Sequence, residues 1–156
     1  MPNLQLTQSP TVQTAMLIRK PPDEVFEAFV NPNLITKFWF TNSSGRLEAG
    51  RTVVWEWEMY GIRVPITAKA VEPPTRIVLD FPSPLGLTQV EWRFTAMPAG
   101  TFVEVIQTGL VGDGDELVKT AMDAVQGFTI VLAGAKAWLE HGIQLELVSD
   151  RFPKGK

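Results

Sequence analysis

The sequence predicts an α+β domain in which a curved antiparallel sheet of about six or seven strands packs around one long C-terminal helix. Short segments with an apolar residue at every second position follow one another through most of the chain, and loops of hairpin length join them. Two short helical segments come after the first strand, and a long helical pattern closes the series at residues 113–142. Because a helix of that length cannot bury its apolar face against a small element, we expect the sheet to curl around it.

The first elements are marked by proline, asparagine and acidic residues. Residues 1–10 are polar and are expected to form a loose lead-in. A strand is predicted for Thr11–Arg19, because two prolines follow it and cannot continue a hydrogen-bonded ladder. The Pro-Asp-Glu run at 22–24 favours the start of a short helix, and Asn31 can cap a second one that ends at Lys37.

Six further strands are predicted from the alternation of apolar and polar residues between turns that contain glycine, proline or serine. They cover residues 46–48, 53–59, 62–72, 76–81, 88–96 and 101–108. The segment Pro82–Gly86 is expected to be a loop between two of them. In the fourth strand of the chain, 62–72, the inner face is predicted to consist of Val64, Ile66, Ala68 and Ala70.

The long helix is predicted from an apolar stripe at helical spacing. Asp113 or Asp115 can cap its start, and Gly142 suits a left-handed residue just after its end. The stripe consists of Leu117, Ala121, Ala124, Phe128, Leu132, Ala135 and Leu139. The tail that follows, residues 143–156, is expected to lie back on the body of the domain.

Two glycines lie on one edge of this helix. Gly127 and Gly134 are seven residues apart, and each costs the helix about 1 kcal/mol relative to alanine. We therefore expect a bulky group to press against this edge, either a tryptophan from the sheet or a ligand.

Composition narrows the function classes. The 156 residues fit a single domain, and a net charge of −3 without a basic patch argues against a nucleic-acid partner. No apolar run approaches the ~20 residues of a membrane span, and the first residues lack the pattern of a secretory signal. Zero cysteines exclude disulfides, thiol catalysis and thiolate metal sites. Together these features favour a cytoplasmic protein.

Several short motifs carry a resemblance to a known family. They are Pro21-Pro22-Asp23-Glu24-Val25-Phe26, Phe38-Trp39, the segment 71–79, Gly100-Thr101 before Val103-Glu104-Val105, and Ala137-Trp138-Leu139. With this order of elements the chain resembles the START-like, or SRPBCC, superfamily of helix-grip folds. Within it, the chain is most similar to the branch grouped with the C-terminal domain of the activator of the heat-shock protein 90 ATPase. The resemblance covers roughly residues 12–141 and concerns structural motifs, so it indicates a fold rather than an activity.

Aromatic side chains on the inner face of the sheet are the candidate ligand contacts, because the resemblance implies a cavity between sheet and helix. Strand parity directs toward the helix the side chains of Trp55, Trp57, Phe81, Trp92 and Phe94. Phe128 faces them from the helix, Trp39 would form the lid region, and Gln107 would supply a polar contact. A filled aromatic core without a cavity is the alternative that the same pattern allows.

Charged side chains are predicted on the outer face, where they form cross-strand pairs. They are Glu56, Glu58, Arg63, Arg76, Asp80, Glu91 and Arg93. The interior therefore lacks a strong acid or base, and Thr101 and Gln107 are its polar candidates. His141 is the lone histidine, no Gly-x-Ser-x-Gly motif occurs, and Asp113-Gly114-Asp115 lacks the later residues of a calcium loop. We expect neither a catalytic residue nor a metal or other cofactor.

Binding of a small hydrophobic or aromatic molecule between the sheet and the helix is the function that this pattern favours. One alternative is a polyketide cyclase or aromatase, in which Gln107, Thr101 or a water would handle protons. Another is a protein-interaction domain like the co-chaperone, which a solid core and an exposed apolar patch would favour. A homodimer and a protein partner both stay open.

Overall fold

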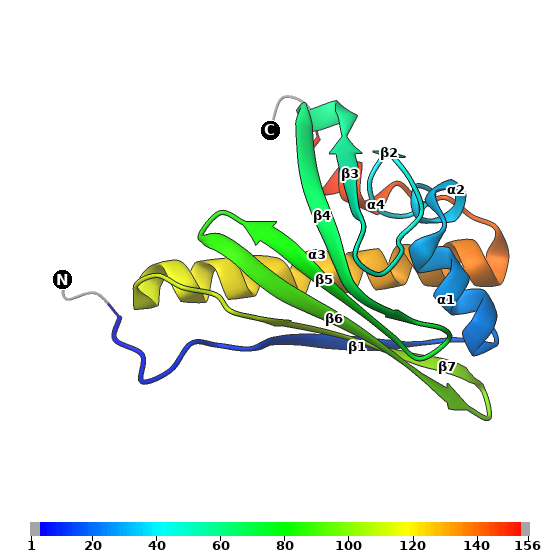
Figure 1. The fold of residues 1–156 in the computed structure, drawn as a ribbon, viewed down its shortest axis with the longest axis horizontal. Helices are drawn as coiled ribbons and strands as arrows, with labels where there is room; N and C mark the ends of the chain where they lie inside the picture. Colours follow the sequence, from blue (N-terminus) through cyan, green and yellow to red (C-terminus); the bar gives the residue numbers. More distant parts are fainter. Residues whose placement is uncertain (1–3, 154–156) are drawn as a thin grey trace.

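The computed structural model describes residues 4–153 and confirms the predicted α+β fold. Its elements are β1 (Val12–Ile18), α1 (Pro22–Val30), α2 (Pro32–Ile35), β2 (Asn42–Ser43), β3 (Thr52–Trp57), the 3-10 turn η1 (Glu58–Tyr60), β4 (Ile62–Glu72), β5 (Arg76–Ser83), β6 (Gly86–Met97), β7 (Gly100–Thr108), α3 (Gly114–His141) and α4 (Leu147–Arg151). The seven strands form one antiparallel sheet in the order β1-β7-β6-β5-β4-β3-β2. Figure 1 shows α3 running across one face of this curved sheet, with α1 and α2 at one end.

The segment from β1 to α2 forms largely as predicted. β1 pairs antiparallel with β7, so the N-terminal strand lies beside the last one at an edge of the sheet. Proline and two acidic residues occupy the first turn of α1. The Asn31 side chain caps α2 by accepting a hydrogen bond of 2.9 Å from the backbone N–H of Asn33. The second helix ends at Ile35 rather than at Lys37.

The strand predicted for residues 46–48 is wrong. The structure has instead the two-residue strand β2, which pairs with β3. Arg46 forms a bidentate ion pair with Glu27 of α1, in which both N–O distances are 2.7 Å. The Leu47 backbone N–H donates to the Val30 carbonyl oxygen over 3.1 Å. These contacts hold the segment against the end of α1, so it does not join the sheet.

Strand β4 has the predicted bounds but an irregular register. The pairing with β5 shifts between Ala68 and Ala70. The shift pairs Ala70 with Val78 and turns Val71, opposite Ile77, toward the core. The prediction that Ala70 lies on the inner face is therefore wrong.

The β5–β6 hairpin is longer than predicted. β5 continues to Ser83, which pairs with Gly86 at the start of β6. The loop expected at Pro82–Gly86 therefore reduces to the two residues Pro84 and Leu85, and the hairpin extends further beside α3.

Helix α3 begins and ends where the sequence predicts. Asp113 accepts a 2.9 Å hydrogen bond from the Glu116 backbone N–H, and Gly142 adopts a φ of 65° just after the helix. The helix is long enough to span a membrane, and its mean hydropathy reaches 1.2 over 18 residues. A search for uninterrupted apolar runs does not find it, because polar residues interrupt the apolar stripe. In this fold its apolar stripe covers the sheet, and α3 is the core helix.

The two glycines on the edge of α3 face other groups than expected. A Cβ atom at Gly134 would lie 3.1 Å from the Cβ atom and 3.2 Å from the carbonyl oxygen of Phe38. A Cβ atom at Gly127 would lie 3.0 Å from Nη1 of Arg151. The close protein groups are therefore the chain after α2 and a side chain of α4, and neither is the expected tryptophan of the sheet.

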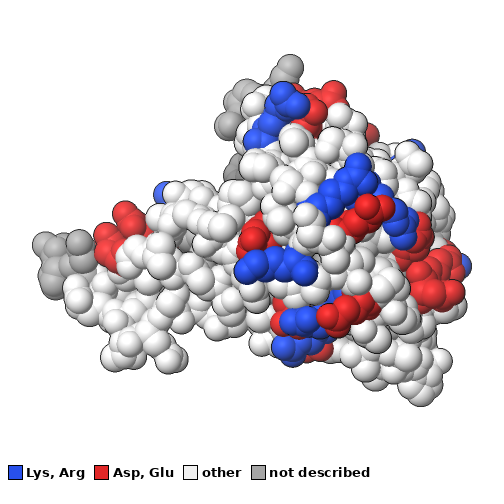
Figure 2. Space-filling view, in the orientation of Figure 1, with Lys and Arg blue, Asp and Glu red and all other residues white. Residues whose placement is uncertain are grey.

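Charged side chains of opposite sign lie next to one another on the outer face of the sheet, as Figure 2 shows from that side. Arg76 and Arg93 share Glu91, with N–O distances of 2.7 and 3.1 Å, and Lys69 pairs with Asp80 at 3.5 Å. The hydrogen bond from Arg93 lowers the pKa of Glu91. Arg63 also pairs with Glu56 at 3.7 Å, so outward pairing is confirmed for the predicted residues on strands, whereas Glu58 lies in η1.

Candidate functional site

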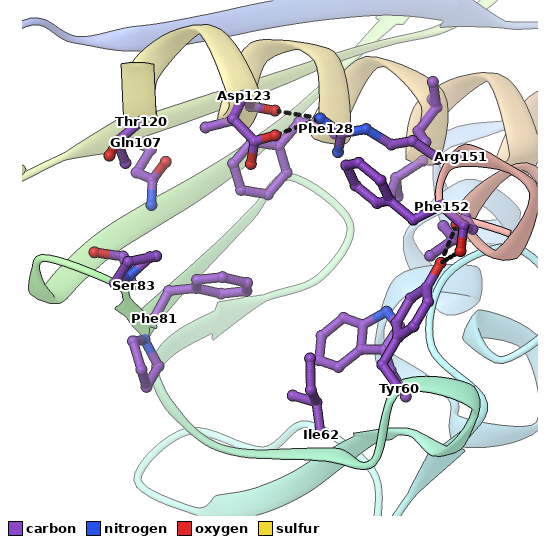
Figure 3. A pocket seen from close by; sticks show the side chains of 18 of the residues that line it. Tyr60, Ile62, Phe81, Ser83, Gln107, Thr120, Asp123, Phe128, Arg151 and Phe152 are labelled. Carbon is purple, nitrogen blue, oxygen red and sulfur yellow. Dashed lines mark hydrogen bonds and ion pairs between the residues drawn. The ribbon is translucent and has the colours of Figure 1, made fainter. Parts of the chain in front are cut away.

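A cavity of about 680 Å³ lies between α3, the β5–β6 hairpin, the η1 turn and α4, and it opens to the surface (Figure 3). Its volume falls within the ~300–1,000 Å³ typical of small-molecule sites, and its lining is mostly apolar. The lining residues are Trp39, Trp57, Tyr60, Ile62, Phe81, Pro82, Ser83, Pro84, Leu85, Gln107, Glu116, Lys119, Thr120, Asp123, Ala124, Gly127, Phe128, Ile130, Val131, Val148, Arg151 and Phe152.

Three aromatic rings form the inner wall of the cavity. Phe81 of β5 stacks against Trp39, with 6.3 Å between ring centroids and 16° between ring planes. Phe128 of α3 meets both rings edge-on, with centroids 6.0 Å from Phe81 and 6.2 Å from Trp39. Because aromatic rings interact favourably through both faces and edges, this wall suits a flat apolar group.

Gln107 of β7 places a buried amide in the lining. Its Nε2 donates to the Thr88 hydroxyl oxygen over 2.8 Å, and the Thr88 hydroxyl donates to the Phe81 carbonyl oxygen over 2.6 Å. Among the described residues, no group donates to Gln107 Oε1. The inner wall therefore combines apolar rings with one hydrogen-bond acceptor whose position is set by its neighbours.

The C-terminal helix α4 closes one side of the cavity. The hydroxyl of Tyr60, in η1, donates toward the carbonyl oxygens of Val148 at 3.0 Å and Phe152 at 3.3 Å. Arg151 forms an ion pair with Asp123 of α3 at 2.6 Å. Figure 3 shows both connections as dashed lines. Residues 147–152 of the tail thus lie back on the body, as expected, and supply a wall of the cavity, while residues 154–156 lie outside the described part of the chain.

The contact residues predicted from the sequence divide into two groups. Those that line the cavity are Trp39, Trp57, Phe81, Gln107 and Phe128. Trp55, Trp92 and Phe94 do not line it and are buried in the core. Trp55 stacks on Phe40 with 4.1 Å between centroids, and Phe94 meets Phe26 of α1 at 5.1 Å. The filled core and the cavity, which the sequence presents as alternatives, therefore share one inner face.

Sequence reasoning missed most of the cavity mouth. Tyr60 and Ile62 come from η1 and the start of β4, where the strand predicted to reach Met59 ends early. Arg151 and Phe152 come from the tail, whose pattern is too short to predict a helix. The one usable signal was Tyr60, the single tyrosine of the chain, directly before a turn glycine.

Titratable groups gather at the mouth of the cavity rather than at its inner wall. Glu116, Lys119 and Asp123 are exposed residues of α3, and Asp123 is paired with Arg151. Within residues 4–153, no group of three His, Cys, Asp or Glu side chains is placed to hold a metal ion. His141 is exposed at the end of α3. The described lining therefore offers binding groups rather than a buried acid–base pair.

Residues 19–140 match the family model described as activator of Hsp90 ATPase homolog 1-like protein, or AHSA1. This chain belongs to the AHSA1-like family. The match covers more than half of the sequence and confirms the resemblance to this branch of the START-like superfamily.

Solved structures share the fold of this AHSA1-like protein. Protein SSP2350 from Staphylococcus saprophyticus is 31% identical, with a TM-score of 0.78 over 87% of this chain and 96% of its own. DynU16, a protein in the dynemicin biosynthetic locus, is 23% identical, with a TM-score of 0.75 over 86% of this chain and 48% of its own. The Aha1 dimer from Colwellia psychrerythraea is 15% identical, with a TM-score of 0.72 over 85% of this chain and 98% of its own. The last two likenesses concern the fold alone. Among curated proteins, none matches this sequence.

Proposed function

We propose that this AHSA1-like protein binds a small hydrophobic or aromatic molecule in the cavity under α3. The observation that carries the proposal is the space of about 680 Å³ between helix and sheet, whose inner wall consists of aromatic rings. The proposed contacts are Trp39, Trp57, Phe81, Gln107 and Phe128. Trp55 and Trp92 would support Trp39 from behind, with centroids 5.0 and 5.5 Å from it, and Phe94 would support the core under α1.

Burial of apolar area would supply most of the affinity. At ~25 cal/mol per Å², a flat ligand that buries about 300 Å² gains about 7.5 kcal/mol before the cost of its lost freedom. After a cost at the low end of the estimated range, about 4 kcal/mol, the dissociation constant from apolar burial alone would lie on the order of millimolar. A polar contact at the inner wall would therefore decide whether binding is tight and selective.

A cyclase-like enzyme is the alternative that the fold also allows. DynU16 lies in a biosynthetic locus, but it shares only its fold with this chain. Its genomic position is therefore no evidence that this chain is an enzyme. A cyclase needs an acid or a base in a dry interior. The carboxylates and the lysine that line this cavity, Glu116, Asp123 and Lys119, are exposed at its mouth. Binding is therefore the function that the geometry supports best.

Ligand titration of the full chain tests the proposal. Biphenyl, a flavone and a medium-chain fatty acid are added while tryptophan fluorescence and the melting temperature are recorded. Trp39 and Trp57, which line the cavity, should report binding through their fluorescence. Ligand at ~100 times its dissociation constant should raise the melting temperature by about 5 °C or more. Absence of both responses for every compound would refute the proposal.

A variant with a blocked cavity locates the binding. Ala124 lines the cavity from α3, so Ala124→Phe would fill part of the space and should weaken binding by about tenfold or more. Met122→Phe is the matched control, because Met122 is 69% exposed on the same helix. The control should bind like the wild type. Equal binding by both variants would place the ligand outside this cavity.

The oligomeric state and the cellular location belong to the same proposal. The Aha1 structure from Colwellia psychrerythraea is a dimer, and we extend this state to the present chain. Light scattering should then give twice the 17.3 kDa of one chain, and the mass of a single copy would refute the dimer. The fold is of a soluble type, with α3 in its core. We place the protein in the cytoplasm, and its recovery with membranes after cell fractionation would contradict this.

A further inference from the structure

A chain of hydrogen bonds sets the direction of the Gln107 amide. The Phe81 carbonyl oxygen can only accept, so the Thr88 hydroxyl, 2.6 Å away, is the donor of that bond. Because its proton is committed there, the Thr88 oxygen accepts from the group 2.8 Å away, which must be the NH₂ group of Gln107. Both side chains are buried, so this assignment does not compete with bulk water.

The same chain of bonds leaves the Gln107 carbonyl oxygen, Oε1, without a donor among residues 4–153. Less than 1 Å² of this atom is accessible, so water does not satisfy it, and the open space that Gln107 borders is the cavity. A donor in the cavity reaches Oε1 once the amide tilts toward it. Ser83, another polar residue of the lining, already donates its hydroxyl to the Gly86 carbonyl oxygen at 2.9 Å. Figure 3 shows Gln107 between Thr120 of α3 and Phe81 of β5. A buried acceptor is costly unless a donor meets it.

We propose that the ligand is an aromatic molecule with a hydroxyl or N–H donor at its edge, and that Gln107 Oε1 accepts this hydrogen bond. This inference rests on the proposed function and names the class of ligand for the same cavity. The ring of the ligand would lie against Phe81 and Phe128, with the donor at the inner end. Gln107 is then the specificity-determining residue, because a ligand without the donor leaves Oε1 unpaired and binds more weakly.

A pair of probes that differ only at the donor tests the inference. The full chain is titrated by calorimetry at about pH 7 with 4-hydroxybiphenyl and with 4-methoxybiphenyl, in which a methyl group replaces the phenolic proton. The hydroxyl compound should bind about tenfold more tightly or better. Equal affinities would overturn the inference and leave the proposed function intact.

Two leucine variants assign the preference to one side chain. Gln107→Leu removes the acceptor and should reduce the ratio of the two affinities to within about twofold, while 4-methoxybiphenyl still binds. Gln89→Leu is the matched control, since Gln89 is exposed on β6, and it should keep the full ratio. A ratio that persists in Gln107→Leu would overturn the role of Gln107.

A measurement on the wild type covers the case in which Gln107→Leu does not fold. In protein with labelled glutamine, the Cδ carbonyl resonance of Gln107 should shift with 4-hydroxybiphenyl and stay in place with 4-methoxybiphenyl. An identical response to both would overturn the inference. If neither biphenyl binds while other compounds of the panel do, the aromatic donor class is wrong. If no compound binds at all, the proposed function fails with it.

Discussion

Alanine at Gly134 should destabilise the protein whereas alanine at Gly127 should not, although both glycines lie on one edge of α3. At Gly134 the new Cβ atom would meet the backbone of Phe38, with its carbonyl oxygen at 3.2 Å. Phe38 is buried and packs edge-on against Phe29 with 5.3 Å between centroids, so it cannot move aside. At Gly127 the close group is the end of the Arg151 side chain at 3.0 Å, which can swing away.

The magnitudes follow from three opposing effects. Helix propensity favours alanine by about 1 kcal/mol at either position. Overpacking costs about 1–3 kcal/mol, so Gly134→Ala should be less stable than the wild type by about 1 kcal/mol. In Gly127→Ala, the displaced Arg151 loses part of an ion pair worth at most about 1 kcal/mol, so this variant should equal the wild type or exceed it slightly.

Thermal unfolding followed by circular dichroism measures the difference. Gly127→Ala should melt about 2–8 °C above Gly134→Ala, as expected for a difference of about 1–2 kcal/mol in a chain of this size. Urea unfolding of the same three proteins gives an independent value. Equal gains in both variants would show that α3 is not pressed against the chain that follows α2, and would refute the reasoning.

Three further substitutions test other parts of the structure. Tyr60→Phe removes the hydroxyl that donates to carbonyl oxygens of α4, so amide hydrogen exchange in α4 should quicken by about tenfold, and unchanged protection would contradict this. The hydrogen bond from Arg46 holds the pKa of Glu27 below its ordinary value of 4.5. The ion pair therefore stabilises the fold above pH 4.5, and this stabilisation is lost as the pH falls through the lowered pKa. Urea midpoints of the wild type and Glu27→Gln should therefore differ at about pH 7 and converge at about pH 2, and a constant difference would argue against the linkage. Thr88→Val removes the acceptor of the buried Gln107 Nε2 and should lower the free energy of unfolding by about 1–3 kcal/mol, which a urea midpoint equal to that of the wild type would disprove.

Much of the sheet could be predicted from the sequence because strand alternation is a local property. The inward direction of Trp55, Trp92 and Val103 follows directly from it. The bulge near Ala68 could not be predicted, since one extra residue within an alternating strand leaves no local mark. The segment 46–48 was misread for a related reason, because Leu47 finds its backbone partner in α1 rather than in a neighbouring strand.

The cavity could be predicted only in part. Strand alternation shows which side chains point inward, but it does not show which of them a helix covers. Gln107 and Phe81 point inward by parity and line the space. Phe94 also points inward, but α1 packs over it, and no local pattern shows which part of the inner face that helix covers. The contact of Tyr60 with Val148 joins residues 88 positions apart, so the wall formed by α4 follows from tertiary packing alone.

Methyl-group NMR during titration with 4-hydroxybiphenyl tests most directly whether the space under α3 holds a ligand. Saturable shifts are predicted for the lining residues Ile62, Ile130, Val131 and Val148. The methyl groups of Ile66 and Ile77, buried in the core, should stay in place. Saturable shifts on another surface of the molecule, or none for the lining residues at any concentration, would contradict a ligand site between the helix and the sheet.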